Sequence, residues 1–311
     1  MKTYILQRIF SGMIVMLGLS IFSFALLHLI PGDPAQLMLG GKATAEQIAN
    51  LREQLGLNKP LPSQYFQYIQ GLLTGDLGDS YKTGRPVLYE LLERFPATAK
   101  LAFTGTIIAI ALGIPLGIIA ARHKGGKLDR LLLAIATVGF SLPTFWCGLL
   151  VIMVFAVKLG WFPIAGGTGW RDLILPAFTL GVLQSTIIIR LTRSTMVEVL
   201  GNEYIRTARA KGLNESIIMV RHAFRNVMVP VVTVLGLQIA SLLGGAIITE
   251  QVFNWPGIGT LSIEAISNRD FPIIQGSIML IGFVYVIVNL IVDLLYMLID
   301  PRIQYSSKEA A

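Results

Sequence analysis

Six long apolar runs dominate this chain and limit what it can fold into. They cover approximately residues 9–30, 101–121, 131–157, 173–189, 227–249 and 273–299. Each run is close to the roughly 20 apolar residues that an α-helix needs to cross a bilayer. Only helices and closed barrels satisfy every backbone hydrogen bond in lipid. The runs therefore predict an all-α membrane protein with six transmembrane helices.

The composition agrees with this assignment. Hydrophobic residues make up 54% of the 311 residues and charged residues only 14%, whereas a soluble domain carries about a quarter charged residues. The fourth run is the weakest, because Pro176 and Gly181 interrupt it. The first run is too long for the apolar part of a signal peptide and lacks a clear cleavage site, so we expect a retained anchor.

Lysine and arginine residues gather in alternate connections between the runs. The 122–130 connection holds four of them in nine residues, and the 190–226 connection holds seven. The two ends of the chain add Lys2, Arg8, Arg302 and Lys308. Because short cytoplasmic loops are enriched in these residues, we expect both termini in the cytoplasm. The same topology accounts for the net charge of +7, so we expect no nucleic-acid partner.

The 32–100 segment is too polar to span a membrane. It predicts short helices at 44–56 and 62–73, separated by a turn at Asn58-Lys59-Pro60. It is either a small external domain or a cover over the mouth of a pore. We therefore divide the chain into a tail with helix 1 (1–31), an extracytoplasmic segment (32–100), a core of helices 2–6 (101–303) and a cytoplasmic tail (304–311).

The chain lacks the common motif for binding ATP. A P-loop needs Gly, four residues, then Gly-Lys-Ser/Thr. Here Leu128 follows Gly126-Lys127, and Ala121 stands where the first glycine belongs. We therefore expect a chain that is not an enzyme and that binds no ATP or other cofactor itself.

The histidines and the single cysteine offer no metal site. His28, His123 and His222 are far apart in the sequence, whereas a zinc site needs several convergent ligands. Cys147 lies within an apolar run, which is typical of a buried, inert thiol. We expect no bound metal.

Two polar residues stand inside the last run. Asp293 is the one acid well inside a predicted span, and Asn289 lies four residues earlier on the same helix face. A charge in lipid costs roughly 2.5–3.5 kcal/mol on insertion scales. The pair lies either on a solute path or at a contact between helices, and the sequence leaves both open.

Small residues in the second and fifth apolar runs also have two possible roles. Such residues let helices approach closely. They either pack helices within this chain or form a seam with another subunit. The residues are Gly105, Gly113, Gly117, Gly236, Ser241, Gly244 and Gly245.

The longest basic connection predicts two short helices around a glycine turn. Good helix formers occupy 208–211, and Gly212 follows where a helix end favours glycine. Asn214 is a suitable N-cap, with Glu215 in the first turn of the next helix. That helix would carry an apolar stripe at Ile217, Val220 and Phe224. A loop that only fixed topology would not need this arrangement, so we interpret it as a docking element.

The same connection resembles the cytoplasmic coupling loop of ABC importer permeases. The similarity is to the oligopeptide, dipeptide, glutathione and nickel group, and it rests on residues 203–212 and 222–226. The general importer loop reads Glu-Ala-Ala, three residues, Gly; here Arg206-Thr207-Ala208 precede Gly212, a variant usual for this group. Other matching motifs follow in order: Pro31-Gly32-Asp33-Pro34, Gly75-Asp76-Leu77-Gly78, Asn254-Trp255-Pro256-Gly257-Ile258-Gly259, Asp270-Phe271-Pro272 and Asp300-Pro301-Arg302.

The resemblance implies a type I ABC importer permease fold in a bacterial cytoplasmic membrane. It implies a heterodimer with a second permease, two ATPase subunits that hold ATP and Mg, an external solute-binding protein and surrounding lipid. It also implies that the helix near 203–215 sits in a groove of an ATPase subunit. Cargo could be a dipeptide, an oligopeptide, glutathione or a nickel chelate.

The resemblance also suggests roles for particular residues. Small residues of the coupling loop would pack closely in the ATPase groove, and its cations would pair with acids at the rim. The set is Glu203, Arg206, Thr207, Ala208, Arg209, Ala210, Lys211, Gly212, Leu213 and Arg225. Trp255 and Phe271 are candidate contacts for the binding protein, although aromatic residues also anchor spans at the membrane interface.

Two other classes of protein remain as alternatives. A secondary transporter would carry its own ion relay, usually with several charged residues at mid-depth and internal repeats. A membrane enzyme would need convergent catalytic side chains near one membrane face. The sequence shows one intramembrane acid, no evident repeat and no such cluster, so it favours the importer.

Overall fold

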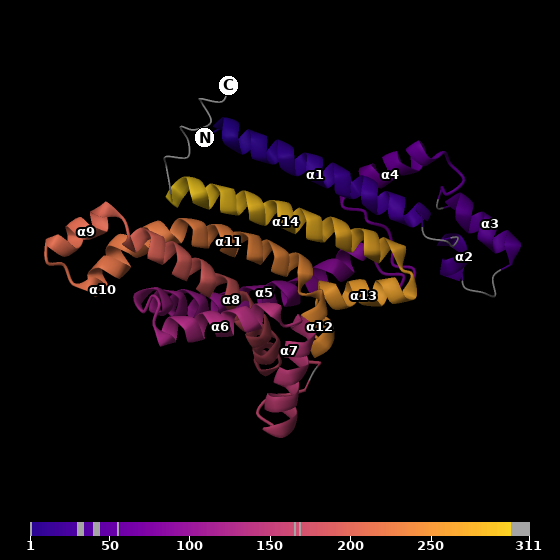
Figure 1. Ribbon diagram of the computed structural model, residues 1–311. Helices are drawn as coiled ribbons and strands as arrows, with labels where there is room; N and C mark the ends of the chain where they lie inside the picture. Colours follow the sequence, from indigo (N-terminus) through magenta and orange to yellow (C-terminus); the bar gives the residue numbers. More distant parts are fainter. Residues whose placement is uncertain are drawn as a thin grey trace. The chain divides into compact units, whose positions relative to one another are not determined.

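Helices joined by loops make up the part of the chain that the computed structural model describes (Figure 1). That part comprises residues 2–29, 34–39, 44–54, 56–164, 166–167 and 169–299. Within it, the only β-type pairing is an isolated bridge between Asp79 and Pro86. The all-α prediction is therefore confirmed. The 304–311 tail, the 300–302 motif, and the predicted boundaries at 31/32 and 303/304 lie outside the described residues.

The chain divides into two compact units. The first unit comprises Met1–Thr98 and Pro256–Val286, and the second comprises Ala99–Trp255 and Ile287–Ala311. Two long helices, α5 (Val87–Arg122) and α14 (Phe271–Ile299), contribute to both units. The other helices of the first unit are α1 (Lys2–Leu29), α2 (Pro34–Leu39), α3 (Ala45–Gln54), α4 (Leu61–Thr74) and α13 (Ile258–Asn268).

The second unit contains the remaining helices, and two of its elements are π-helices. These are η1 (Ile152–Lys158) and η2 (Ile218–Ala223). The α-helices are α6 (Lys127–Ser141), α7 (Thr144–Val151), α8 (Trp170–Leu200), α9 (Glu203–Ala210), α10 (Glu215–Ile217), α11 (Phe224–Gly245) and α12 (Ile247–Phe253).

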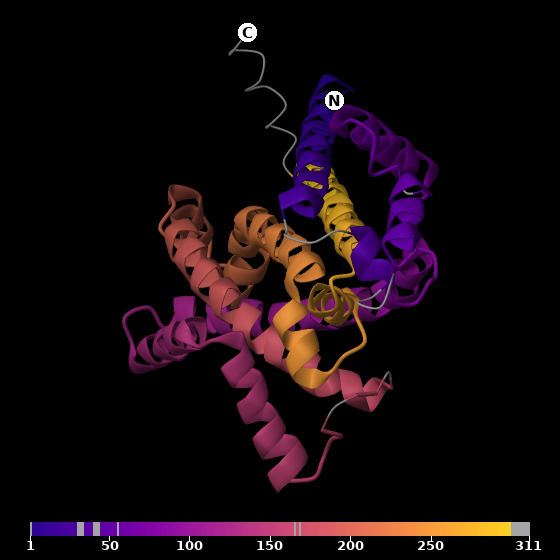
Figure 2. The same cartoon turned by 90° about the vertical axis from the view of Figure 1, so that its right-hand side faces the viewer.

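Among the described residues, five helices are long and apolar enough to cross a membrane, and one bent pair would make a sixth span. The five begin at Ile5, Val87, Trp170, Glu215 and Phe271. The predicted third span at 131–157 is not one straight helix. It consists of α6, then α7 with η1, bent by 105° at Leu142-Pro143 (Figure 2). Proline disfavours helical backbone at the residue before it, and Leu142 is extended with ψ at 133°.

The fourth predicted span is stronger than the sequence suggested. Pro176 lies inside α8, which continues without a break for 31 residues. Gly181 brings α8 against α5, because a Cβ there would lie 2.6 Å from the side chain of Ile108. This helix is the most buried of the candidate spans, so α8 forms the centre of the second unit.

Glycines on α5 complete the contact with α8. A Cβ at Gly113 would lie 2.6 Å from Ile188, and a Cβ at Gly117 would lie 2.6 Å from Thr192. On α11, a Cβ at Gly236 would lie 2.2 Å from Val292 of α14. These glycines therefore pack helices within the chain, which decides between the two alternatives for them.

In the first unit, α4 packs along α1. Tyr65 and Ser20 share a hydrogen bond of 2.9 Å between their hydroxyl oxygens, and the Tyr68 hydroxyl donates to the hydroxyl oxygen of Ser23 at 3.3 Å. The helices expected at 44–56 and 62–73 are present as α3 and α4. Two features were missed: α2, and the start of α5 at Val87, well before residue 101.

Candidate functional site

The predicted docking element is a compact helix–turn–helix at one end of the second unit (Figure 1). Helix α9 turns two apolar side chains inward, Ile205 at 0% and Ala208 at 7% exposure. They join a hydrophobic cluster with Met196 of α8, Ile218 of η2 and Val227 of α11. The element is therefore packed onto the ends of the spans, so that a force on α9 acts on α8 and α11.

The turn after α9 has the predicted backbone. Gly212 has a φ of +75°, a value that L-residues other than glycine rarely adopt. Asn214 caps the next helix, since its side-chain oxygen accepts a hydrogen bond from the Ser216 amide at 2.9 Å. Glu215 lies in the first turn of that helix. The predicted helix, glycine turn and capped helix are all confirmed.

Two residues of the predicted apolar stripe, Ile217 and Val220, lie at the surface, and other apolar residues of the same segment are buried. Ile217 and Val220 are 46% and 66% exposed, whereas Ile218 and Ala223 are fully buried. The segment includes the π-helical turn of η2, in which hydrogen bonds run from residue i to i+5. The exposed stripe offers apolar area to a partner, and its role in docking stays a prediction.

A salt bridge closes the turn. The Arg209 guanidinium donates to both carboxylate oxygens of Glu215, at 2.6 Å and 3.2 Å. The hydrogen bond to Glu215 raises the pKa of Arg209 above its ordinary value, so the guanidinium stays charged. Arg209 is thus engaged within the chain while its side chain stays 42% exposed, and its expected pairing with a partner's acids stays a prediction. The Arg206–Glu203 pair is much more exposed, with side-chain exposures of 72% and 93%.

Ala208 also differs from its expected role. Its side chain is buried in the chain's own core, so its small size lets α9 approach η2 and does not serve contact in a foreign groove. The other expected coupling residues are exposed: Glu203, Arg206, Thr207, Arg209, Ala210, Lys211, Gly212, Leu213 and Arg225.

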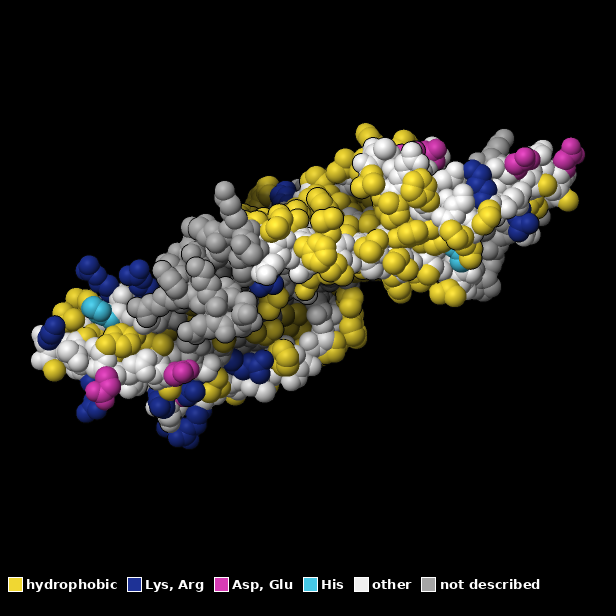
Figure 3. Space-filling view, turned by 90° about the horizontal axis from the view of Figure 1, so that it is seen from above, with side chains coloured by type: hydrophobic (Ala, Val, Ile, Leu, Met, Phe, Trp, Pro, Cys, Tyr) yellow, Lys and Arg dark blue, Asp and Glu magenta, His cyan; other side chains and the backbone are white. Residues whose placement is uncertain are grey.

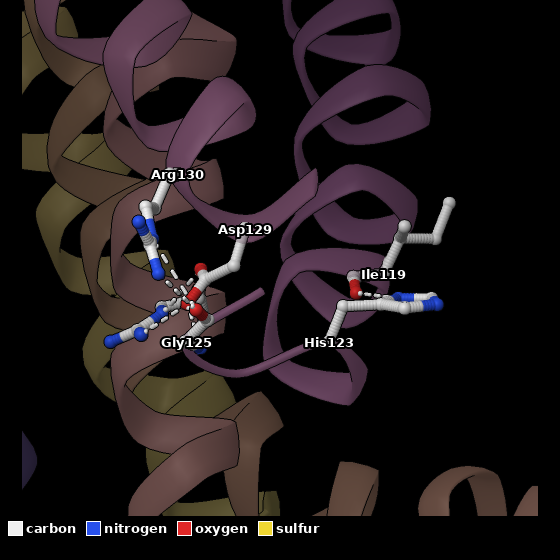
Figure 4. A network of polar contacts seen from close by, with 6 residues as sticks. Ile119, His123, Gly125, Asp129 and Arg130 are labelled. Atoms are coloured by element: carbon white, nitrogen blue, oxygen red, sulfur yellow. Dashed lines mark hydrogen bonds and ion pairs between the residues drawn. The ribbon is translucent and has the colours of Figure 1, made fainter. Parts of the chain in front are cut away.

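The sequence did not predict a second salt bridge in this unit, which is centred on Asp129 (Figure 4). The carboxylate of Asp129 accepts from Nε and Nη2 of Arg193 at 3.0 Å and 2.7 Å, and from the Gly125 amide at 2.8 Å. The Arg130 guanidinium donates to the Gly125 carbonyl oxygen at 3.0 Å. These contacts tie the 122–130 connection to α8. Asp129 is the single acid in that basic connection, which was the available clue.

Tyr204 and Asn226 make a further tie that the sequence did not suggest. The Asn226 side-chain amide donates to the Tyr204 hydroxyl oxygen at 2.7 Å. This bond joins α9 to the first turn of α11. Lysine and arginine side chains gather at this end of the second unit, at the left in Figure 3. The exposed cations here are Arg122, Lys124, Lys127, Arg130, Arg206, Arg209, Lys211, Arg221 and Arg225.

The first unit contains an ordered loop of its own. Asp270, only 4% exposed, accepts from the Ser80 hydroxyl at 2.5 Å and from the Tyr81 amide at 3.1 Å. Burial and the nearby Asp270 carboxylate raise the pKa of Tyr81 to about 12, so its phenol stays protonated at physiological pH. Two motifs far apart in sequence, around residues 75–80 and 270–272, therefore meet in one loop.

The expected contacts for a binding protein are not at the surface. Trp255 is 2% exposed and Phe271 is 4% exposed. Their burial contradicts the expected contact with a binding protein, because neither ring offers area to a partner. Cys147 is half-buried, less enclosed than predicted.

Asn289 and Asp293 are half-buried on α14 in the second unit. Each takes part in a polar or electrostatic interaction. Their two possible roles, solute path or helix contact, stay predictions. Across the described ranges, no three His, Cys, Asp or Glu residues are grouped so that they could hold a metal ion.

Comparison with known families decides the class of protein. Residues 113–305 match the family described as binding-protein-dependent transport system inner membrane component, and residues 1–102 match the N-terminal region of such membrane components. The chain belongs to this family. It is a membrane-spanning permease of an ABC importer, and a secondary transporter is not favoured.

Named relatives support the same class along the whole chain. The permease is 43% identical over 305 residues to the glutathione transport system permease protein GsiC of Salmonella paratyphi A, covering 98% of this chain and all of that protein. The GsiC protein of Escherichia coli K12 is equally similar, at 43% over 305 residues.

A solved structure supports the fold. One chain of the inward-facing MetNI methionine ABC transporter matches with a TM-score of 0.59 and 18% identity, covering 68% of this permease and 97% of that chain. A second crystal form of MetNI gives a TM-score of 0.58. At this identity the likeness concerns fold alone, and it supports the type I importer permease fold.

Proposed function

We propose that this permease carries peptides or peptide-like solutes, with glutathione as the leading candidate, into the bacterial cytoplasm. The observation that carries the proposal is the 43% identity to glutathione permeases over 98% of the chain. Similarity that extends over both the outer segment and the spans favours a related cargo. Oligopeptides and nickel chelates remain the competing cargoes.

We further propose that both termini and the 203–215 segment lie in the cytoplasm and that two separate ATPase subunits, which bind ATP and Mg, dock there. The cations at this end agree with the positive-inside rule. Exposed apolar side chains lie among them, Tyr204 at 41%, Leu213 at 37%, Ile217 at 46% and Val220 at 66%. A rim of cations around exposed apolar side chains suits a protein partner with an acidic rim.

The remaining partners follow from the same family. A second permease would complete the pathway, and an external solute-binding protein would deliver cargo to the 32–100 segment. The Asp270 loop supports the second role, since it holds residues 80–83 in one conformation. A fixed outer loop gives a binding protein a defined surface at low entropic cost.

Uptake by reconstituted proteoliposomes tests the cargo. Vesicles with both permeases and the ATPases, supplied with ATP and the binding protein, should accumulate labelled glutathione. Unlabelled glutathione should compete with the label better than trialanine or a nickel chelate. Accumulation without the ATPases would contradict the importer, and competition by the nickel chelate alone would contradict the peptide-like cargo.

Cross-linking tests the docking site. The chain has one cysteine, so Cys147→Ser gives a background in which Thr207→Cys is the single thiol. We expect Thr207→Cys to form a short bismaleimide cross-link to the ATPase. Thr74→Cys, exposed at the end of α4, is the matched control and should form none. Equal labelling at both positions would contradict the assigned site.

A further inference from the structure

A pocket of about 380 Å³ lies in the second unit, at the bend between α6 and α7 where α8 and α11 also line it. Most of its lining is apolar. The polar side chains among its described lining residues are Thr144, Gln184, Gln238 and Ser241, and none of these lining residues carries a charge. Neither Asn289 nor Asp293 lines it, so it is separate from the polar pair on α14.

Gln238 is the unusual member of this lining. Its side chain is only 9% exposed, and its Nε2 atom is buried without a hydrogen-bond partner among the described residues. Burial of an amide donor without an acceptor is unfavourable. A packing role alone would be better filled by an apolar side chain. The carboxamide therefore indicates a hydrogen-bond partner that binds transiently.

The depth of the pocket favours a solute as that partner. Gln184 lies six positions before Arg190, and Gln238 lies thirteen positions after Arg225. At 1.5 Å per residue these separations are about 9 Å and about 20 Å along the helices. Both carboxamides are thus well inside the spans, where polar groups commonly mark a solute path.

The broken helix adds hydrogen-bond donors at the same place. Thr144 is both a pocket residue and the first residue of α7. The first amide groups of a helix have no acceptor within the helix. Nearby, Arg190 stacks on the ring of Phe140 at 4.4 Å, and Phe140 lines the pocket. The pocket thus contains the carboxamides of Gln184 and Gln238 and lies at the first backbone amides of α7. The Arg190 guanidinium lies behind Phe140, outside the lining.

We propose that Gln184 and Gln238 bind the peptide-bond amides of the cargo as it crosses the membrane. A carboxamide donates and accepts hydrogen bonds in the same pattern as a peptide bond. It therefore fits the backbone of any short peptide, whatever its side chains. The absence of charge in the lining keeps binding weak, so that cargo leaves again. This inference rests on the proposed function, because only an amide-rich cargo would use such a pair.

The double variant Gln184→Met/Gln238→Met tests the proposal in the complete reconstituted complex. Methionine keeps the length of the side chain but makes only weak hydrogen bonds. Labelled glutathione and labelled trialanine are the probes. We expect uptake of both to fall at least fivefold, while ATP hydrolysis stimulated by the binding protein and the melting temperature are unchanged. Gln251→Met, at an exposed carboxamide on α12 that does not line the pocket, should keep normal uptake.

The outcomes are separable. Normal uptake by the double variant would overturn the inference and leave the proposed function intact. Reduced uptake with a lowered melting temperature would also overturn it, because the glutamines would then be structural. If the wild-type complex transports neither probe, the proposed cargo fails first, and the inference fails with it.

Discussion

The end of the second unit that carries α9, α10 and Asp129, which we propose as the coupling end, and the membrane pocket lined by Gln184 and Gln238 differ in how their polar groups are paired. At the coupling end, Arg209 pairs with Glu215, and Arg193 pairs with Asp129. In the pocket, no described lining residue carries a charge, and the side-chain nitrogen of Gln238 has no hydrogen-bond partner among the residues that the structure describes. The difference indicates that the first region holds a fixed shape, whereas the second is suited to binding and releasing a solute. A part that transmits force needs the first property, and a path for solute needs the second.

The largest expected effect comes from breaking the glycine turn. Gly212→Pro cannot adopt a φ of +75° and removes the amide that donates to the Arg209 carbonyl oxygen, so the mismatch costs more than about 1 kcal/mol. We expect co-purification of the ATPase to fall more than tenfold, measured by pull-down from membranes with equal permease content. The matched control is Gly160→Pro, at a φ of +63° away from the coupling end. If Gly160→Pro lost the ATPase equally, the turn would have no special role.

Removing one charge of the Asp129–Arg193 pair should have the next largest effect. The Asp129 side chain is 3% exposed and that of Arg193 is 23% exposed, so Asp129→Asn leaves a partly buried guanidinium without its counter-charge. We expect a loss of about 2–3 kcal/mol, measured as a lower melting temperature in detergent. Arg206→Gln breaks an exposed pair and should change stability by less than about 0.5 kcal/mol. Equal shifts for both variants would show that the Asp129 pair does not stiffen this end.

A smaller effect is expected at Tyr204. Tyr204→Phe removes the oxygen that accepts from Asn226 at 2.7 Å. One neutral hydrogen bond contributes about 1 kcal/mol, so we expect a small fall in melting temperature and slightly faster tryptic cleavage at Arg206 and Arg209. Tyr89→Phe, on an exposed ring of the first unit, is the control and should leave both unchanged. Unaltered cleavage in Tyr204→Phe would show that this hydrogen bond does not contribute to the rigidity of the coupling end.

The sequence predicted the fold class well, because hydropathy is a property of long windows. It located all six apolar runs and the turn around Gly212, whose backbone only glycine adopts easily. The sequence did not predict whether a proline within an apolar run would bend the helix. Pro143 bends a continuous apolar run by 105°, whereas Pro176 lies within an unbroken α8. Neighbouring helices decide between these outcomes, and a single sequence does not show them.

The site was predictable only in part, for a similar reason. Exposure along 203–213 follows from charge and helical pattern, but the burial of Ala208 depends on η2. The apolar pattern of the next segment also did not indicate that Ile218 and Ala223 are buried while Ile217 and Val220 are exposed. Contacts between residues far apart in the sequence, such as Asp129 with Arg193 and Asp270 with Ser80, become visible only in the folded structure. The pocket glutamines were overlooked because each stands alone in an apolar run.

The most direct test measures ATP hydrolysis and solute uptake in the same proteoliposomes for one variant of each region. Gly212→Pro should lose hydrolysis stimulated by the binding protein and uptake together, because the ATPase no longer acts on the spans. Gln184→Met/Gln238→Met should lose uptake and keep hydrolysis. If the two variants lost both activities in equal proportion, the division between a rigid coupling end and an exchanging membrane pocket would be contradicted.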